Sequence, residues 1–206
     1  MSYFEIRSLT NCAKKYGNFL NDYEPDEEIR EFRSFDKTFG GFSKTPIIFE
    51  RDKSYKNNEP ISDFLLNDWA EIIVSERIFK MLNEKYSNEI QFFECFAKDD
   101  GILKPYFILR PKFEIDVLDR NLSDMIDYGV AVSAFKSVLN DNIDAKYNYF
   151  AVKDGDSSVI SKKLYDDLKA LKPTNFEVST IATSSEELAG REKNRIKAEQ
   201  KQNQPE

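Results

Sequence analysis

The stretch IVSERIFKMLNEKYSNEIQF, residues 73–92, has a counterpart later in the chain, VISKKLYDDLKALKPTNFEV at residues 159–178. The two align without a gap, and although only a Ser and a Leu are identical, almost every apolar position is kept. Each begins with a short apolar run typical of a buried strand, continues with apolar residues at helical spacing, and ends in a second apolar run. The sequence therefore predicts a strand–helix–strand unit that occurs twice.

The shared Ser, Ser75 in one copy and Ser161 in the other, stands between the predicted strand and the predicted helix. A Ser nucleophile needs a base, but the chain contains no His, and neither Ser has a Lys three residues further on. Ser is strongly preferred at a helix N-cap, where its hydroxyl accepts a hydrogen bond from a backbone N–H of the first turn. We therefore interpret both residues as helix caps.

Further strands are predicted at residues 90–96, 106–110, 113–119 and 176–181, with a hairpin turn at the DDG sequence of residues 99–101. Helices that alternate irregularly with several strands indicate an α+β fold. We expect one body containing two related strand–helix–strand units with a mixed or antiparallel sheet. Two closely packed lobes are the alternative.

The composition of the chain changes along its length and suggests three parts. A variable N-terminal segment with an acidic stretch, residues 1–44, precedes an α+β domain at residues 45–181. The two similar units of that domain lie at about residues 63–118 and 147–181. Residues 182–206 form a charged tail without an apolar face to bury, for which we expect a frayed helix or a disordered segment.

The overall charge narrows the range of partners. The 206 residues carry a net charge of −7, with a pI of about 4.9. Nucleic-acid binders and proteins of anionic membrane surfaces need basic patches, so we expect neither partner here. The two Cys give no disulfide framework, and the sequence has no signal peptide or membrane-spanning run. These features favour a cytoplasmic protein.

The absence of His excludes Ser-His-Asp catalysis, Cys-His catalysis and imidazole metal ligands. The S-x-x-K match from Ser133 to Lys136 lacks the partner motifs that its chemistry requires. The Asp-Gly sequences at 99–101 and 154–156 lack the twelve-residue calcium loop and are interpreted as turns. We expect no cofactor and no metal.

An acidic run near the N-terminus is the candidate interaction surface. Such runs are most often solvated faces, but they can also dock a basic partner. The candidate residues, in which a Tyr could serve as an aromatic anchor, are Asp22, Tyr23, Glu24, Asp26, Glu27, Glu28 and Glu31.

The order of motifs between residues 45 and 181 resembles a family of bacterial immunity-type domains found beside polymorphic and secreted toxins. The resemblance rests on an Asp-Phe before the first unit, on IVS or VIS before each helix, and on YFIL followed by VLD between the units. It implies an antitoxin, with no catalytic activity of its own, that binds a cognate toxin and covers its active site or substrate groove. The acidic balance of the chain suggests that this toxin is basic.

Two other functions remain open at the level of sequence. One is a non-toxin protein-interaction module, monomeric or oligomeric. The other is a hydrolase in which two carboxylates do acid–base work without His. Its catalytic pair would come from Asp99, Asp100, Asp116, Asp119, Asp154 and Asp156.

Overall fold

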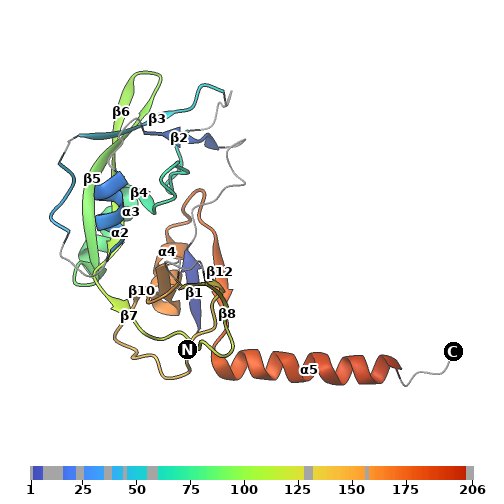
Figure 1. Ribbon diagram of the computed structural model, residues 1–206. Coiled ribbons are helices and arrows are strands. Elements are labelled where there is room, and N and C mark those ends of the chain that lie inside the picture. Colours follow the sequence, from blue (N-terminus) through green and yellow to red (C-terminus); the bar gives the residue numbers. More distant parts are fainter. Residues whose placement is uncertain are drawn as a thin grey trace.

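The protein has a mixed α+β fold that forms one body, as predicted (Figure 1). Two five-stranded sheets and a two-stranded ribbon account for its strands among the described residues. The computed structural model describes residues 2–6, 16–21, 26–34, 39–43, 46–54, 60–127, 132–155 and 158–202.

One five-stranded sheet, which we call sheet B, has the strand order β2-β3-β5-β6-β4. Its longest members are β5 and β6, two ten-residue strands that form a hairpin. Asp100 and Gly101 at its turn both take positive φ, as a tight two-residue turn requires. The strands are β2 (Phe19–Leu20), β3 (Ile47–Arg51), β4 (Ile73–Ser75), β5 (Ile90–Asp99) and β6 (Ile102–Pro111).

The second sheet, sheet A, has the order β12-β1-β11-β10-β7. Its second strand in this order, β1, comes from the N-terminal segment and pairs antiparallel with β11 on one side and β12 on the other. The strands are β1 (Tyr3–Ile6), β7 (Glu114–Ile115), β10 (Tyr149–Val152), β11 (Ser158–Ser161) and β12 (Val178–Ile181).

The two predicted units share one topology. Strands β4 and β5 run parallel, are joined by helix α3 (Glu76–Tyr86), and have the antiparallel strand β6 between them. Strands β11 and β12 also run parallel, are joined by helix α4 (Lys162–Ala170), and have β1 between them. The prediction of two related strand–helix–strand units is confirmed. The first is completed by β6, which directly follows β5, and the second by β1 from the N-terminal segment.

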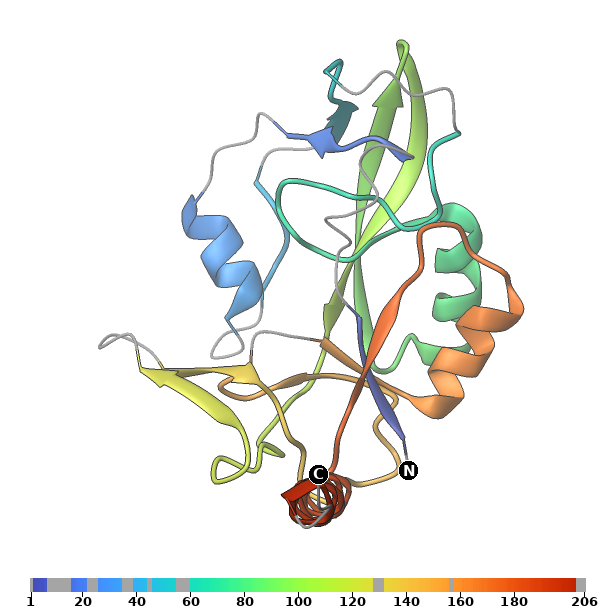
Figure 2. The same ribbon diagram turned by 90° about the vertical axis from the view of Figure 1, so that its right-hand side faces the viewer.

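Helices α3 and α4 lie on the same side of the molecule and share one hydrophobic core (Figure 2). Their apolar faces recur at helical spacing, so each helix buries one stripe against its own sheet. The Tyr86 hydroxyl of α3 donates to the Asp167 carboxylate of α4 at 2.7 Å, and Lys85 forms an ion pair with the same carboxylate at 3.1 Å. The buried core residues of the two helices are Ile78, Leu82, Tyr86, Leu164 and Leu168.

The remaining elements cover the other faces of the sheets. Helix α2 (Asp26–Arg33) packs Phe32 against Phe93 of sheet B, on the face away from α3. The ribbon of β8 (Asp124–Asp127) and β9 (Val132–Lys136) contributes Met125 and Ala134 to the core beneath sheet A.

Helix α5 (Ser184–Gln202) projects from this end of the molecule (Figure 1). The tail is therefore helical through residue 202. Glu186 accepts a hydrogen bond from the Thr183 backbone N–H at 2.9 Å, and Asp141 accepts one from the Ser185 N–H at 3.1 Å. These carboxylates satisfy N–H groups that a helix start leaves without intrahelical partners.

Two sequence predictions are wrong in detail. Ser161 accepts from the Leu164 N–H at 3.3 Å and caps α4, but the Ser75 side chain makes no capping bond. The Ser75 hydroxyl instead donates to the Asp63 carboxylate at 2.8 Å, in a charge-assisted hydrogen bond. The strand expected at 113–119 is also short, since only β7 pairs. The Val117 N–H bonds back to the Ile115 carbonyl at 3.1 Å, and this turn takes the chain out of the sheet.

Candidate functional site

The acidic run maps onto helix α2 and the segment before it. Asp22, Tyr23 and Glu24 lie outside the described residues, and Asp26 and Glu27 form the first turn of α2. Further along the helix, Glu31 is exposed and Glu28 is partly exposed. The Glu28 carboxylate accepts a hydrogen bond from the Ser43 N–H at 3.1 Å. The part of the run that can be placed is therefore helical, and its Glu31 faces solvent.

A buried arginine fixes helix α2 against sheet B. The Arg110 side chain comes from β6 and is only 6% exposed. It donates to the Phe32 carbonyl and the Ser34 carbonyl, both at 2.6 Å. These carbonyls belong to the end of α2, where intrahelical partners are missing and a cation is favourable. Burial lowers the pKa of Arg110, and the two charge-assisted bonds offset part of that cost.

A second contact fixes the same end of α2. Arg33 donates to Glu71 at 2.6 Å, in the loop that precedes β4. Burial raises the pKa of the Glu71 carboxyl, and the neighbouring Arg33 charge opposes that rise. Beneath the helix, Phe32 packs against three other aromatic rings at centroid distances of 5.5 Å. Helix α2, which exposes Glu31 together with Arg30 and Arg33, is thus firmly anchored on sheet B.

The carboxylates considered for a hydrolase are dispersed. Asp99 and Asp100 form the hairpin tip, where Asp99 pairs with Arg51 at 2.8 Å. Asp119 accepts from Ser184 at 2.7 Å, and this bond lowers the pKa of its carboxyl, which is the opposite of what a general acid needs. Asp156 lies outside the described residues.

One pair from that set does converge. Asp116 and Asp154 both bind the Arg120 guanidinium, at 2.9 and 2.7 Å, on the exposed surface. The two carboxylates raise the pKa of Arg120, so the shared cation is firmly charged. This arrangement is that of a surface ion-pair triad.

The structure also shows where the two residues of the S-x-x-K match lie. Ser133 and Lys136 lie in strand β9, and the Lys136 ammonium pairs with Glu187 of α5 at 3.1 Å. In the part of the chain that the structure describes, no group of three or more potential ligand residues could hold a metal ion.

Sequence reasoning missed a groove along strand β3. Helix α3 stands over β5 and β6, where Phe79 stacks on Phe107 at 3.8 Å and meets Phe92 at 5.0 Å. On the same face of sheet B, the β2–β3 side forms an open groove of about 550 Å³. We call this the β3 groove. Its lining includes Leu20, Pro46, Ile48, Glu50, Lys53 and Lys98.

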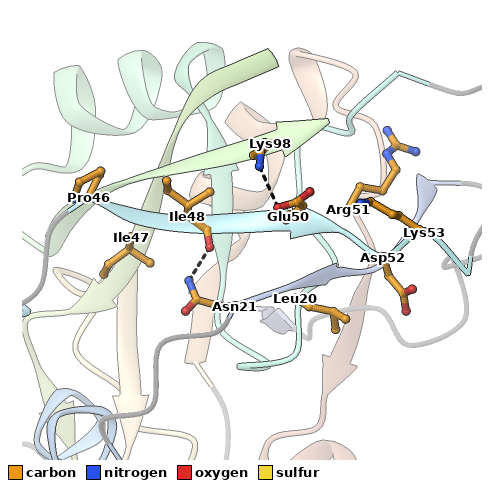
Figure 3. Close-up of a pocket in the computed structure, with 10 residues that line it drawn as sticks. All are labelled: Leu20, Asn21, Pro46, Ile47, Ile48, Glu50, Arg51, Asp52, Lys53 and Lys98. Carbon is orange, nitrogen blue, oxygen red and sulfur yellow. Dashed lines mark hydrogen bonds and ion pairs between the residues drawn. The ribbon is translucent and has the colours of Figure 1, made fainter. Parts of the chain in front are cut away.

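Strand register explains the composition of the β3 groove. Leu20, Glu50, Lys98 and Leu103 are direct neighbours across β2, β3, β5 and β6, so their side chains share one face. Leu20 is 40% exposed and Leu103 49% exposed. Between them, Lys98 pairs with Glu50 at 3.0 Å, and Ile48 projects beside Glu50 from the side of β3 opposite to Ile47 (Figure 3).

Comparison with known proteins adds no relative. The sequence matches no protein-family model and no curated protein. None of the helices among the described residues has the length and apolar character to cross a membrane.

Proposed function

We propose that the protein is an immunity protein, which binds and neutralises a cognate bacterial toxin or effector by covering its active site or substrate groove. The observation that carries the proposal is the anchored acidic helix α2, whose exposed Glu31 is held in place through the buried Arg110. The order of motifs between residues 45 and 181, which resembles immunity-type domains, supports it.

The physical basis is electrostatic complementarity on a rigid surface. A chain of net charge −7 attracts a basic partner over a range of about 10 Å at ordinary salt, which raises the association rate. Because α2 is already fixed by Arg110 and Arg33, binding would not have to order it, and that lowers the entropic cost of association. In this proposal the protein performs no chemistry, needs no cofactor, and acts in the cytoplasm.

Co-expression with the toxin encoded beside this gene tests the proposal. We expect cells carrying both proteins to survive and cells carrying the toxin alone to die. Equal killing in the presence and absence of the protein would contradict an immunity function.

A charge-reversal pair tests the role of α2. We expect Glu28→Lys with Glu31→Lys to slow toxin binding, most strongly at low salt, because steering by surface charge is screened by salt. Glu84→Lys with Glu177→Lys makes the same charge change at exposed positions outside α2 and serves as the control. Identical association rates for the two double variants would show that the contact surface does not include α2.

A further inference from the structure

Strand β12 leaves one edge of sheet A open. The Ala182 carbonyl points away from β1, because it accepts a hydrogen bond from the Leu139 N–H at 3.0 Å. Backbone groups alternate in direction along a strand, so the N–H and C=O groups of Val178 and Thr180 point to the same side. Within the described residues, no backbone group bonds to these two residues there, and Thr180 is exposed. Their hydrogen-bonding groups therefore lack a neighbouring strand in the described structure.

Sheet B shows how this chain closes sheet edges elsewhere. The outer edge of β2 is bonded to Leu66, and that of β4 is bonded to Leu65. Strand β6 extends past β4 with Pro105, which has no N–H to offer a neighbour. Covering, charge and Pro are the usual means of preventing unwanted strand pairing. Strand β12 has neither a charge nor a Pro in Val178–Ile181, so it is an edge suited to pairing.

The edge of β12 is complementary to itself. When a second β12 lies antiparallel with Ser179 opposite Ser179, each Val178 stands opposite a Thr180 of the other copy. Both residues direct their backbone groups outward, so the two strands form a regular antiparallel ladder. No charged side chain lies in β12, so like charges do not meet on the ladder, although each chain carries a net charge of −7.

The ends of the open edge favour a second copy as its occupant. Leu139 donates to the Ala182 carbonyl and accepts from the Ser184 N–H at 2.8 Å, so it occupies the edge directly beyond Thr180. A long strand added beside β12 would run into Leu139. The antiparallel arrangement places the start of the incoming β12 at this end, and the chain turns just before β12, where Asn175 has a φ of +58°. The short strand β12 therefore fits a space that a longer strand does not.

Helix α4 leaves room for this pairing. Tyr165 of α4 stacks on Phe4 of β1 at a centroid distance of 4.3 Å, so the helix lies above β1 and not above the open edge. With strands about 4.8 Å apart, a two-fold axis just outside β12 would separate the two α4 helices by about 14 Å. Packed helices are 8–10 Å apart, so the two copies of α4 do not collide.

We propose that β12 pairs with β12 of a second copy, so that two copies of sheet A join across a two-fold axis at Ser179. A four-residue strand is a small contact beside the roughly 1,200–2,000 Å² that stable interfaces bury, so the dimer is weak and forms at high protein concentration. This inference goes beyond the immunity function and does not depend on it.

Disulfide crosslinking tests the register. In this arrangement the two Ser179 residues form a non-hydrogen-bonded pair with Cα atoms about 4.5 Å apart, a distance that a disulfide can span. In a Cys12→Ser background, where the remaining natural Cys95 is buried, we expect Ser179→Cys to give a disulfide-linked dimer under mild oxidation. Glu177→Cys is the control, because position 177 is also exposed but its two copies would be about 13 Å apart along the strands.

Removal of an outward N–H tests the hydrogen bonding. Thr180→Pro deletes one donor from each copy, and an edge strand tolerates Pro where the N–H faces away from the sheet. We expect sedimentation equilibrium to give a dimer dissociation constant at least about tenfold higher than that of the natural protein. Thr180→Val keeps the N–H and a β-branched side chain, so it should dimerise like the natural protein. Circular dichroism checks that each variant is folded, and the crosslinking result decides if Thr180→Pro does not fold.

Three results would overturn the proposal. The first is a natural protein that stays monomeric at its highest soluble concentration and gives no crosslink from position 179. The second is a dimer that a folded Thr180→Pro leaves intact, or equal crosslinking from positions 177 and 179, because the contact would then lie elsewhere. The third is crosslinking of position 179 to a strand of another protein in place of a second copy, which would identify a different occupant of this edge.

Discussion

Asp63 and Thr174 stand 111 residues apart in the chain and hold the two strand–helix–strand units together through three hydrogen bonds. The Thr174 N–H donates to the Asp63 carboxylate at 2.9 Å, while the Asp63 N–H donates to the Thr174 hydroxyl at 2.8 Å. The same carboxylate accepts from Arg77 at 2.6 Å and from Ser75 at 2.8 Å. One acidic side chain thus connects the start of α3 with the loop that follows α4.

Replacing this carboxylate should loosen the joint between the units. We expect Asp63→Asn to lower the free energy of unfolding by about 2 kcal/mol, because the charge-assisted bonds from Arg77 and Thr174 lose their ionised acceptor. Urea denaturation measures the loss. Asp166→Asn, at an exposed ion pair with Lys162 on α4, is the matched control and should cost less than about 0.5 kcal/mol.

The contribution of Asp63 should also depend on pH. Burial disfavours the charged form, but bonds from Arg77, Thr174 and Ser75 outweigh it and lower the pKa of Asp63. A carboxyl with a lowered pKa in the folded state stabilises the protein above its unfolded pKa of about 3.9, and the stabilisation is lost as pH falls below it. We expect the stability difference between the natural protein and Asp63→Asn to be full at pH 6 and to shrink below about pH 4. A difference that does not change with pH would exclude this role.

The two equivalent Ser residues should respond differently to substitution. Ser161→Ala removes a true helix cap and should cost about 1 kcal/mol in any background. Ser75→Ala removes a bond to Asp63, so its cost should largely disappear when Asp63→Asn is already present. A double-mutant cycle measures both, and an equal coupling of Asp63 to Ser75 and to Ser161 would contradict the structure.

Ala70 offers a stabilising substitution. Its φ of +57° lies in the left-handed region, which costs a residue with a Cβ about 1 kcal/mol. We expect Ala70→Gly to raise the free energy of unfolding by about 0.5 kcal/mol after the entropic penalty of Gly in the unfolded chain. Ala145→Gly, at an exposed turn position with negative φ, should instead be neutral or destabilising. Thermal denaturation of the two variants distinguishes these results.

Arg110 should control the packing of helix α2. Arg110→Leu leaves the carbonyls of Phe32 and Ser34 without their donor, so we expect a loss of about 2–3 kcal/mol. Trp69 is the only Trp and packs against Phe42 and Phe49 in the same core, so its fluorescence should shift to the red. Arg120→Leu, on the exposed surface, should leave the emission unchanged.

Local pattern was enough to predict the two units and the hairpin strand β6 that completes the first, but not the completion of the second by β1. Apolar spacing located α3, α4 and the strands beside them, because these signals lie within about twenty residues of sequence. Strand β1 gives no sign that its partners are residues 158–161 and 178–181, since pairing partners so far away leave no local pattern. The different bonding of Ser75 and Ser161 likewise depends on Asp63, which lies outside the matched stretch.

The same difference between local and long-range signals applies to the candidate sites. The acidic run is visible in the sequence, and the structure places Glu28 and Glu31 on α2. The β3 groove could not be predicted, because it depends on the register that aligns Leu20, Glu50 and Lys98 across three strands. No single segment of sequence carries that information.

The interior place of β1 in sheet A sets an order for folding during synthesis. Strand β1 (Tyr3–Ile6) is made well before its two partners, β11 and β12, which follow much later in the chain. Sheet A therefore cannot close until β12 has been synthesised, whereas β3 to β6 of sheet B can pair earlier. Until then the nascent chain carries β1 without either of its neighbours, so sheet A is completed later in synthesis than the β3 to β6 part of sheet B.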